Sequence, residues 1–336
     1  RDAELDLGAF SADYSEARDK FLSAAAALNS TMTVFTNPNR GPKGETLTTD
    51  LAWIGPEDAG KVAVLISGTH GVEGFCGSGA QVAWMRSDAA RRLPRDIAVL
   101  AIHAINPHGF AWIRRVTEEG VDLNRNHIDF AQPLPVNAGY AELADAFVPA
   151  EIEGPVLEAA LAKLKAWRDR HGDAAYFRAY SAGQYTHPDG VFYGGTGPTW
   201  SRRTTEAICQ RFLSRRRYVA GVDFHTGLGP HGYGDPICHH PIGSPALARA
   251  LAWYGDSLTG STLGTTGSFA RDGLTGFGYV RALPGVEVNF VTLEYGTYPR
   301  EQGHKAFRED HWLHRTSNAA AFDTEKGRRI KAQIRR

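Results

Sequence analysis

Two histidines and a glutamate at glycine-rich turns could bind a metal ion. His70 and Glu73 stand three residues apart in the run Ser-Gly-Thr-His-Gly-Val-Glu-Gly at 67–74, whose glycines allow the backbone a tight path. His225 follows a second apolar run, in Gly-Val-Asp-Phe-His-Thr-Gly at 221–227. Catalytic Zn²⁺ commonly takes two histidines and one glutamate and leaves one position for water. The sequence therefore predicts one Zn²⁺ per chain, held by His70, Glu73 and His225.

Cys238, His239 and His240 form a rival group, because thiolate and imidazole side chains also bind zinc. These residues lie between Pro236 and Pro241 and follow no strong strand pattern. His225 is therefore the preferred third ligand, although one of the two histidines could still line the pocket.

Residues that bind anions cluster after the second apolar run. Guanidinium groups bind carboxylates through paired hydrogen bonds, so these arginines could hold a carboxylate near the metal. Asp122 could accept the other ring N–H of His70 and so fix its tautomer. The alternative is a polar loop whose arginines form surface ion pairs. The residues are Arg114, Arg115, Asp122, Asn124, Arg125 and Asn126.

Glu294 ends the last strongly apolar run of the chain. An acid at the end of a buried strand is poorly placed for structure unless it faces a site, so Glu294 is a candidate general base for a metal-activated water. A buried carboxylate with a purely structural role is the alternative.

Short apolar runs and amphipathic stretches alternate along the chain, which predicts strands and helices in turn. Such alternation is typical of an α/β/α sandwich around a mixed, mostly parallel sheet, and such sheets bind ligands beyond the carboxyl ends of their strands. The predicted strands are 61–67, 96–102, 218–224 and 286–293. The predicted helices are 11–28, 77–92, 154–171, 201–215, 244–257 and 301–317.

A single catalytic domain over 1–336 is expected from this pattern. Residues 130–198 are less regular, and a long excursion of this kind is typical of a lid or rim around a site. A packed surface subdomain is the alternative. The basic tail at 325–336 predicts a frayed, solvated helix end rather than a docking arm.

Composition excludes several classes of partner. The 336 residues carry 37 Lys plus Arg against 37 Asp plus Glu, so no global field would attract nucleic acid or an anionic membrane. The three cysteines are scattered, which favours a reducing compartment over a disulfide framework. No run approaches the ~18 apolar residues that cross a bilayer. A soluble, cytoplasmic protein is expected, and the sequence indicates nothing about its oligomeric state.

The motifs resemble the zinc carboxypeptidase superfamily in type and order, over residues 61–296. The run His-Gly-Val-Glu-Gly-Phe-Cys-Gly-Ser-Gly at 70–79 and the pair Arg114-Arg115 are similar to an uncharacterised bacterial branch related to aspartoacylases and succinylglutamate desuccinylases. The matching motifs are His70-x-x-Glu73, Asn106-Pro-x-Gly109, Asp122-x-Asn124-Arg125-Asn126, His225 and Glu294.

This resemblance implies roles for single residues. It implies that His70, Glu73 and His225 hold zinc, that Asn124 and Arg125 hold the substrate's carboxylate, and that Glu294 is the general base. Arg115, or less plausibly Arg114, would polarise the scissile carbonyl, and Tyr279 or Tyr233 would cap the substrate. The chain departs from the digestive carboxypeptidases in the short spacing from Arg115 to Arg125 and in residues 130–198.

The function expected from these features is a zinc-dependent hydrolase that cleaves a peptide or N-acyl amide bond in a small substrate with a carboxylate. An N-acyl-amino-acid deacylase of the aspartoacylase type is the alternative. A serine hydrolase using Ser181 is remote, because Ala-Tyr-Ser-Ala-Gly at 179–183 only loosely matches Gly-x-Ser-x-Gly. A non-catalytic zinc protein that captures carboxylate ligands would not need Glu294.

Overall fold

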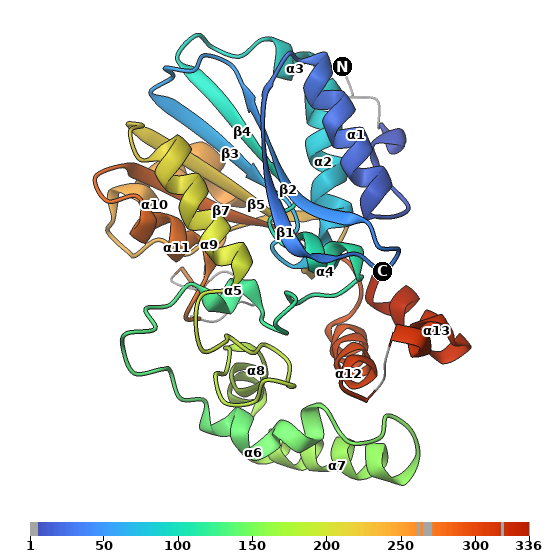
Figure 1. The fold of residues 1–336 in the computed structure, drawn as a ribbon. Helices are drawn as coiled ribbons and strands as arrows, with labels where there is room; N and C mark the ends of the chain where they lie inside the picture. Colours follow the sequence, from blue (N-terminus) through green and yellow to red (C-terminus); the bar gives the residue numbers. More distant parts are fainter. Residues whose placement is uncertain (1–5, 261–262, 265–270, 317–318, 336) are drawn as a thin grey trace.

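A mixed sheet organises the chain. The computed structural model describes residues 1–336 except 1–5, 261–262, 265–270, 317–318 and 336. Within that part, seven strands lie in the order β1-β2-β4-β3-β5-β7-β6 (Figure 1). The strands are β1 (Thr31–Arg40), β2 (Thr46–Ile54), β3 (Lys61–Ile66), β4 (Ile97–His103), β5 (Tyr218–His231), β6 (Gly234–Cys238) and β7 (Glu287–Gly296).

The four central strands β4, β3, β5 and β7 run parallel, and these are the four strands predicted from buried apolar runs. The outer strands β1, β2 and β6 pair antiparallel to their neighbours and were not predicted. Because the central strands are parallel, their carboxyl ends lie at one edge of the sheet, where ligands are expected.

Helices cover both faces of the sheet, so the predicted α/β/α sandwich is confirmed. On one face, α1 (Tyr14–Ala27) and α2 (Gly74–Arg86) pack on side chains of β2 and β4. On the other face, α9 (Trp200–Ile208) and α11 (Thr275–Ala282) pack on β3, β5 and β7. The remaining helices are α3 (Asp88–Arg91), α4 (Pro107–Ala111), α5 (Leu123–Asn126), α6 (Ala138–Phe147), α7 (Gly154–His171), α8 (Asp173–Ser181), α10 (Pro245–Tyr254), α12 (Arg300–Thr316) and α13 (Glu325–Arg335).

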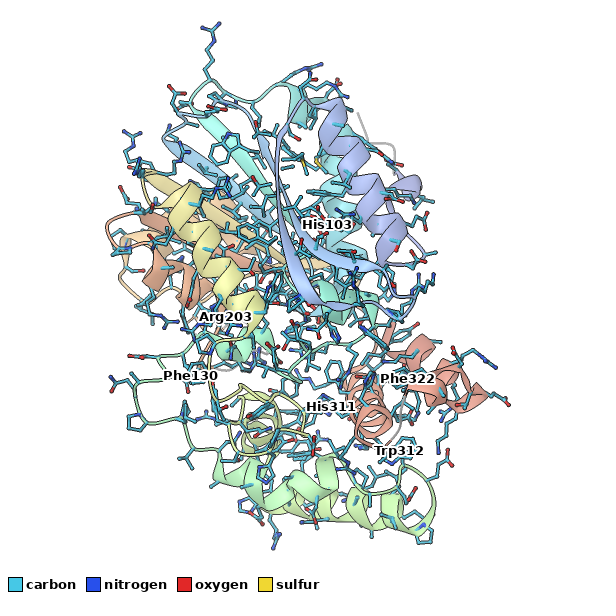
Figure 2. The ribbon with its side chains drawn as sticks, in the orientation of Figure 1. His103, Phe130, Arg203, His311, Trp312 and Phe322 are labelled. Carbon is cyan, nitrogen blue, oxygen red and sulfur yellow. The ribbon has the colours of Figure 1, made fainter. Side chains whose placement is uncertain are left out.

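Residues 130–198 form the helices α6, α7 and α8 at the opposite end of the molecule from α3 (Figure 1). They have an apolar core of their own, which includes Tyr140, Phe147 and Trp167. Helix α12 joins them to the rest of the chain, since Trp312 Nε1 donates to Ala150 O at 2.8 Å (Figure 2). The insertion is therefore packed against α12.

The C-terminal helix α13 is docked, so the prediction of a frayed and solvated tail is wrong. Ile330 and Ile334 are buried, and Lys331 Nζ donates to Asp310 Oδ1 of α12 at 2.8 Å. The basic pattern of the tail concealed these apolar positions, which are four residues apart and lie on one face of the helix. The predicted helix 301–317 corresponds to α12, and its last residue, Ser317, lies outside the described residues. Among the described helices, none has the length and apolar composition that crossing a membrane would need.

Candidate active site

Three neighbouring strands carry the predicted metal ligands and the predicted base to one place. His70 and Glu73 follow the end of β3, and His225 lies in the adjacent parallel strand β5. Glu294 of β7 is the register partner of His225. Among the described residues, ligand atoms of His70, Glu73 and His225 all lie within 4.8 Å of one another, and the three side chains are buried.

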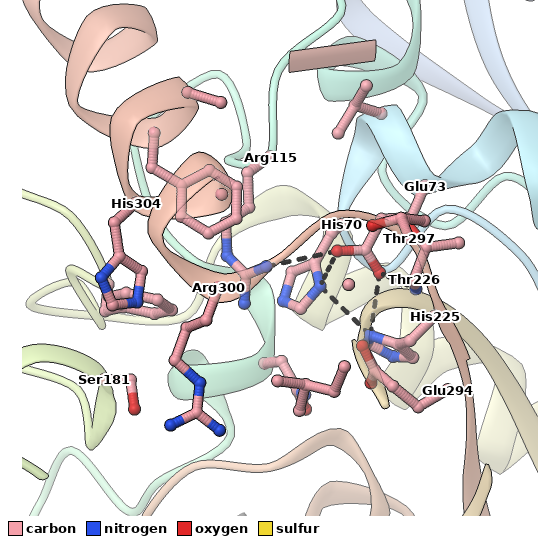
Figure 3. Close-up of a pocket in the computed structure, with 18 of the residues that line it drawn as sticks. His70, Glu73, Arg115, Ser181, His225, Thr226, Glu294, Thr297, Arg300 and His304 are labelled. Atoms are coloured by element: carbon pink, nitrogen blue, oxygen red, sulfur yellow. Dashed lines mark hydrogen bonds and ion pairs between the residues drawn. The ribbon is translucent and has the colours of Figure 1, made fainter. Parts of the chain in front are cut away.

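The facing atoms of this cluster are all hydrogen-bond acceptors or can be (Figure 3). His70 Nδ1 lies 3.0 Å from Glu73 Oε1, and His225 Nδ1 lies 3.2 Å from Glu73 Oε2. The two Nδ1 atoms are 3.1 Å apart. Thr226 N donates to Glu73 Oε2 at 3.0 Å and so holds the carboxylate in place.

Carboxylates behind the two rings determine which nitrogens face the cluster. His70 Nε2 lies 3.0 Å from Asp122 Oδ1, and His225 Nε2 lies 2.9 Å from Asp223 Oδ2. Each carboxylate favours the tautomer with hydrogen on Nε2, which leaves a lone pair on each Nδ1. Two lone pairs and a carboxylate then face each other in a buried space, an arrangement that needs a cation between them. The donor set fits Zn²⁺.

Burial and neighbouring charges shift the acids of this cluster in opposite directions. Burial alone would raise the pKa of Glu73, but His70 and His225 outweigh it and hold that pKa well below its usual value. Glu294 is equally buried, and there burial, with the charge of Glu73, keeps the pKa above its usual value. One carboxylate thus stays ionised as a ligand, while the other is poised to accept a proton.

Arg115 links the cluster to the rest of the pocket (Figure 3). Its Nη1 donates to Glu73 Oε1 at 3.2 Å and its Nε to Asp122 Oδ2 at 3.0 Å. Burial alone would lower the pKa of Arg115, but these two carboxylates more than offset it and raise that pKa. The guanidinium also lies 4.9 Å from the ring centroid of Phe192, which comes from residues 130–198.

Asn124 and Arg125 lie in the short helix α5, which Asp122 caps by accepting from Asn124 N at 3.0 Å. Asn124 Oδ1 accepts from Thr275 N at 2.8 Å and from Thr275 Oγ1 at 3.1 Å. The amide oxygen is thereby occupied, so the Nδ2 donor is the end left for a ligand. Arg125 is fixed by Nη1 and Nη2, which donate to Asn124 O and to Ser181 O at 2.7 and 2.8 Å.

A cavity of about 460 Å³ joins these groups. It is lined by the three metal-ligand candidates together with Arg115, Asn124, Arg125 and Glu294, so the structure brings these seven predicted residues together. Residues 130–198 supply aromatic walls through Phe177, Tyr180 and Phe192, and α12 adds His304 and Phe307.

Three polar lining residues were not anticipated from the sequence: Arg271, Tyr298 and His304. Tyr298 stands four residues after Glu294, and that position just beyond a functional strand end was an available signal. Arg271 and His304 follow no strand, and nothing in the sequence pattern sets them apart.

Two predicted substrate-binding residues lie elsewhere. Arg114 Nε donates to Asp310 Oδ2 of α12 at 3.0 Å, so its charge is used between helices and it is absent from the cavity wall. Tyr279 is 1% exposed and packs 5.2 Å from the ring of Phe290 in the core beneath α11. It sits on the inner face of its helix, which turns it away from the cavity. Tyr233 is 50% exposed, outside the residues that line the cavity.

The rival groups do not form alternative centres. Cys238 is buried in an apolar cluster with α10, and His240 Nε2 accepts from Phe290 N at 2.9 Å. His239 lines the cavity, as one histidine of this group was expected to. Ser181 also lines the cavity, but it ends helix α8, and its hydroxyl donates to Phe177 O at 3.0 Å. That setting lacks the strand-to-helix elbow of a serine hydrolase.

Solved structures of similar fold fall in the group that the sequence motifs resemble. The carboxypeptidase A of Helicoverpa armigera is 13% identical at a TM-score of 0.47, and the match covers 96% of this chain and 73% of that one. An aspartoacylase family protein of Mesorhizobium loti is 14% identical at a TM-score of 0.41, covering 80% and 61%. A succinylglutamate desuccinylase of Silicibacter is 13% identical at a TM-score of 0.41, covering 85% and 66%.

Sequence comparison gives the family. No curated protein matches this chain. A family model described as "Protein of unknown function (DUF2817)" matches residues 10–336, which is nearly the whole chain. The chain therefore belongs to the DUF2817 family.

Proposed function

We propose that the protein is a zinc-dependent hydrolase that cleaves a peptide or N-acyl amide bond in a small substrate bearing a carboxylate. The observation that supports it most is the buried cluster of His70, Glu73 and His225, whose metal-facing nitrogens are oriented by carboxylates behind the rings. A base candidate, Glu294, lies beside this cluster in the same cavity.

His70, Glu73 and His225 would hold the ion. Bound Zn²⁺ would lower the pKa of a water to ~7 and polarise a carbonyl. Glu294 would take one proton from the attacking water and deliver it to the nitrogen of the leaving amine as the C–N bond breaks. The products are a carboxylate and an amine, so one water is consumed for each bond cleaved. The raised pKa of Glu294, caused by burial, suits a group that must both accept and return a proton.

The substrate's carboxylate would bind to Asn124 Nδ2 and Arg125, next to the leaving amine. Arg115 would donate to the scissile carbonyl oxygen, where negative charge develops in the transition state. Its bonds to Glu73 and Asp122 fix the plane of the guanidinium before substrate binds. These roles give three donors at the positions that a carboxylate-bearing amide requires.

The cavity wall favours small substrates. Residues 130–198 would act as a rim that closes one side, and α13 contributes Ile334 and Arg335 on another. A volume of about 460 Å³ suits a dipeptide or an N-acyl amino acid. N-acyl-amino-acid deacylation is therefore the second candidate function. The cysteines Cys76, Cys209 and Cys238 are unpaired, which favours a reducing compartment such as the cytoplasm.

The test combines metal analysis with one substitution. Purified protein should contain one zinc per chain and should hydrolyse members of a panel of dipeptides and N-acetyl amino acids. A chelator should abolish this activity, and added Zn²⁺ should restore it. Glu294→Gln keeps the shape of the side chain but not its basicity, so it should retain zinc and lose kcat by several orders of magnitude, roughly 10³-fold or more.

Glu287→Gln provides the matched control, because Glu287 lies at the other end of β7 and its carboxylate is half exposed. It should leave kcat and zinc content unchanged. Full turnover in Glu294→Gln would remove Glu294 from the reaction, and turnover in zinc-free protein would refute the zinc-dependent function itself.

A further inference from the structure

Arg271 is a cationic side chain in the cavity wall that no acid neutralises. Its Nε atom is buried and has no hydrogen-bond partner, and across the described residues no carboxylate forms an ion pair with its guanidinium. By contrast, Arg115 is paired with Glu73 and Asp122. A buried guanidinium without a partner costs free energy, so such groups are usually matched by a ligand or a carboxylate.

The fold brings Arg271 to the carboxylate-binding side of the cavity. Gly273 lies against the main chain of α5, where a Cβ would come within 2.2 Å of Arg125 O, and its φ of 72° also favours glycine. His127 N donates to Gly273 O at 3.1 Å, and Thr275 binds the Asn124 amide. The segment from Arg271 to Thr275 is therefore bonded along α5 and shares one wall with Asn124 and Arg125.

The two neighbouring arginines form a cationic pair without an internal counter-charge. Burial lowers the pKa of Arg271 to about 9, and the positive charge of Arg125 contributes in the same direction. The hydrogen bonds of Arg125 go to main-chain carbonyls, and its own Nε is also buried without a partner. The acids of the described cavity wall, Glu73 and Glu294, both lie at the metal cluster. This wall therefore has more positive charge than one carboxylate neutralises.

We propose that Arg271 binds a second anionic group of the substrate, so that the leaving amine is an acidic amino acid. The inference rests on the proposed function: the α-carboxylate occupies Asn124 and Arg125, and the side-chain carboxylate reaches Arg271. Both anions belong to the leaving side because Arg271 borders α5. The opposite wall is aromatic, with Phe177, Tyr180 and Phe307, and suits the acyl part of the substrate.

The experiment compares acidic substrates with their neutral isosteres. N-acetyl-L-aspartate and N-acetyl-L-glutamate would be assayed against N-acetyl-L-asparagine and N-acetyl-L-glutamine, in the wild type and in Arg271→Gln. The wild type should prefer the acidic members, and Arg271→Gln should lower their kcat/KM by roughly 30-fold or more, the usual effect of leaving one partner of a buried charge pair alone. The values for the amide members should change less than about threefold.

Arg215→Gln removes the same charge from an exposed surface position and should change neither series. An unchanged preference in Arg271→Gln would overturn the inference. An equal loss on acidic and neutral substrates would also overturn it, because it would mean that Arg271 holds the same carboxylate as Arg125 or serves the fold alone.

Calorimetric binding of L-aspartate, L-glutamate, L-asparagine and L-glutamine separates this inference from the proposed function. Tighter binding of the acidic amino acids in the wild type, lost in Arg271→Gln, supports the inference even if no amide is hydrolysed, an outcome in which the proposed function alone fails. Hydrolysis without any effect of Arg271 would sink the inference and leave the proposed function standing. Absence of both hydrolysis and binding counts against both.

Discussion

Asp223 and Asp122 determine how the two histidines of the site present their nitrogens. Asp223 and His225 are two residues apart on β5, so their side chains lie on the same face of the strand. Thr69 Oγ1 donates to both oxygens of Asp223, at 2.8 and 3.0 Å, and fixes the carboxylate behind the ring. These outer acids increase the basicity of the ligands and hold them in place before an ion binds.

We expect Asp223→Asn to weaken metal binding by about 10–100-fold. The amide removes the negative charge behind His225 and can offer a donor where the ring needs an acceptor, which favours the wrong tautomer. Zinc affinity measured by competition with a chromogenic chelator checks this. Asp256→Asn alters an exposed carboxylate and should bind zinc like the wild type; equal affinities in both variants would contradict the role given to Asp223.

The residues of the site differ in how far sequence could predict them. His70, His225 and Glu294 each follow or end an apolar run, so the parallel sheet had to bring them to one edge. Asp223 had a usable signal, since it alternates with His225 on one strand. Arg271 had none, because its position depends on Gly273 packing against the main chain of a helix nearly 150 residues earlier. Tyr279 was misplaced because the sequence does not show which face of α11 is turned inward.

Sequence patterns identified the buried elements and missed the exposed ones. β3 and β4 are covered on both faces and read as continuous apolar runs. β1 is mostly exposed and rich in threonine and asparagine, and β6 contains a proline, so neither has the pattern of a buried strand. These edge strands pair through backbone hydrogen bonds, and their side chains carry little information about it.

An ionic cluster holds the two C-terminal helices together. Asp310 of α12 accepts from Arg114 Nε at 3.0 Å and from Lys331 Nζ of α13 at 2.8 Å. Asp310 is 1% exposed, so both charge pairs are shielded from water. Since α13 contributes Ile334 to the cavity wall, this cluster keeps that wall in position.

Asp310→Asn should lower the free energy of unfolding by about 3–5 kcal/mol, because it leaves two buried cations without their counter-charge. Chemical denaturation at pH 7 measures this. In the control, Asp145→Asn breaks a surface ion pair with Lys163 and should cost less than about 1 kcal/mol. Similar losses in the two variants would mean that the cluster around Asp310 adds nothing beyond a surface pair.

The same cluster gives a pH dependence of definite sign. Burial alone would raise the pKa of Asp310, but Lys331 and Arg114 outweigh it and hold that pKa well below its usual value. The stabilisation is therefore full above the unfolded-state pKa of about 3.9 and is lost as the pH falls towards the folded-state pKa. The stability gap between wild type and Asp310→Asn should be constant from neutral pH to about 5 and then narrow. A gap that widened in acid would contradict this sign.

At the scale of the molecule, the cavity is assembled from segments far apart in the chain. The sheet supplies the metal cluster, α5 and the segment before α11 supply the anion-binding wall, residues 130–198 supply aromatic side chains, and α12 with α13 closes the remainder. The fold class could be predicted because it follows from local apolar runs. The shape of the cavity could not, because it depends on how these segments pack on each other.

Removing the metal should destabilise the whole chain. An ion held by His70, Glu73 and His225 joins the ends of β3 and β5, and without it two lone pairs and a carboxylate face each other in a buried space. A ligand at 1,000 times its Kd stabilises a protein by about 4 kcal/mol, which for a domain of this size raises Tm by roughly 5–10 °C. Treatment with a chelator should lower Tm by that amount in differential scanning calorimetry.

Zn²⁺ should restore the original Tm and Mg²⁺ should not, since Mg²⁺ prefers oxygen ligands and octahedral geometry. In His225→Gln, Tm should be the same with and without chelator, because the ligand set is incomplete. A chelator shift of equal size in that variant would locate the stabilising ion elsewhere in the chain. An unshifted wild type would show that no ion connects the two strands, and the metal-dependent reaction would lose its structural basis.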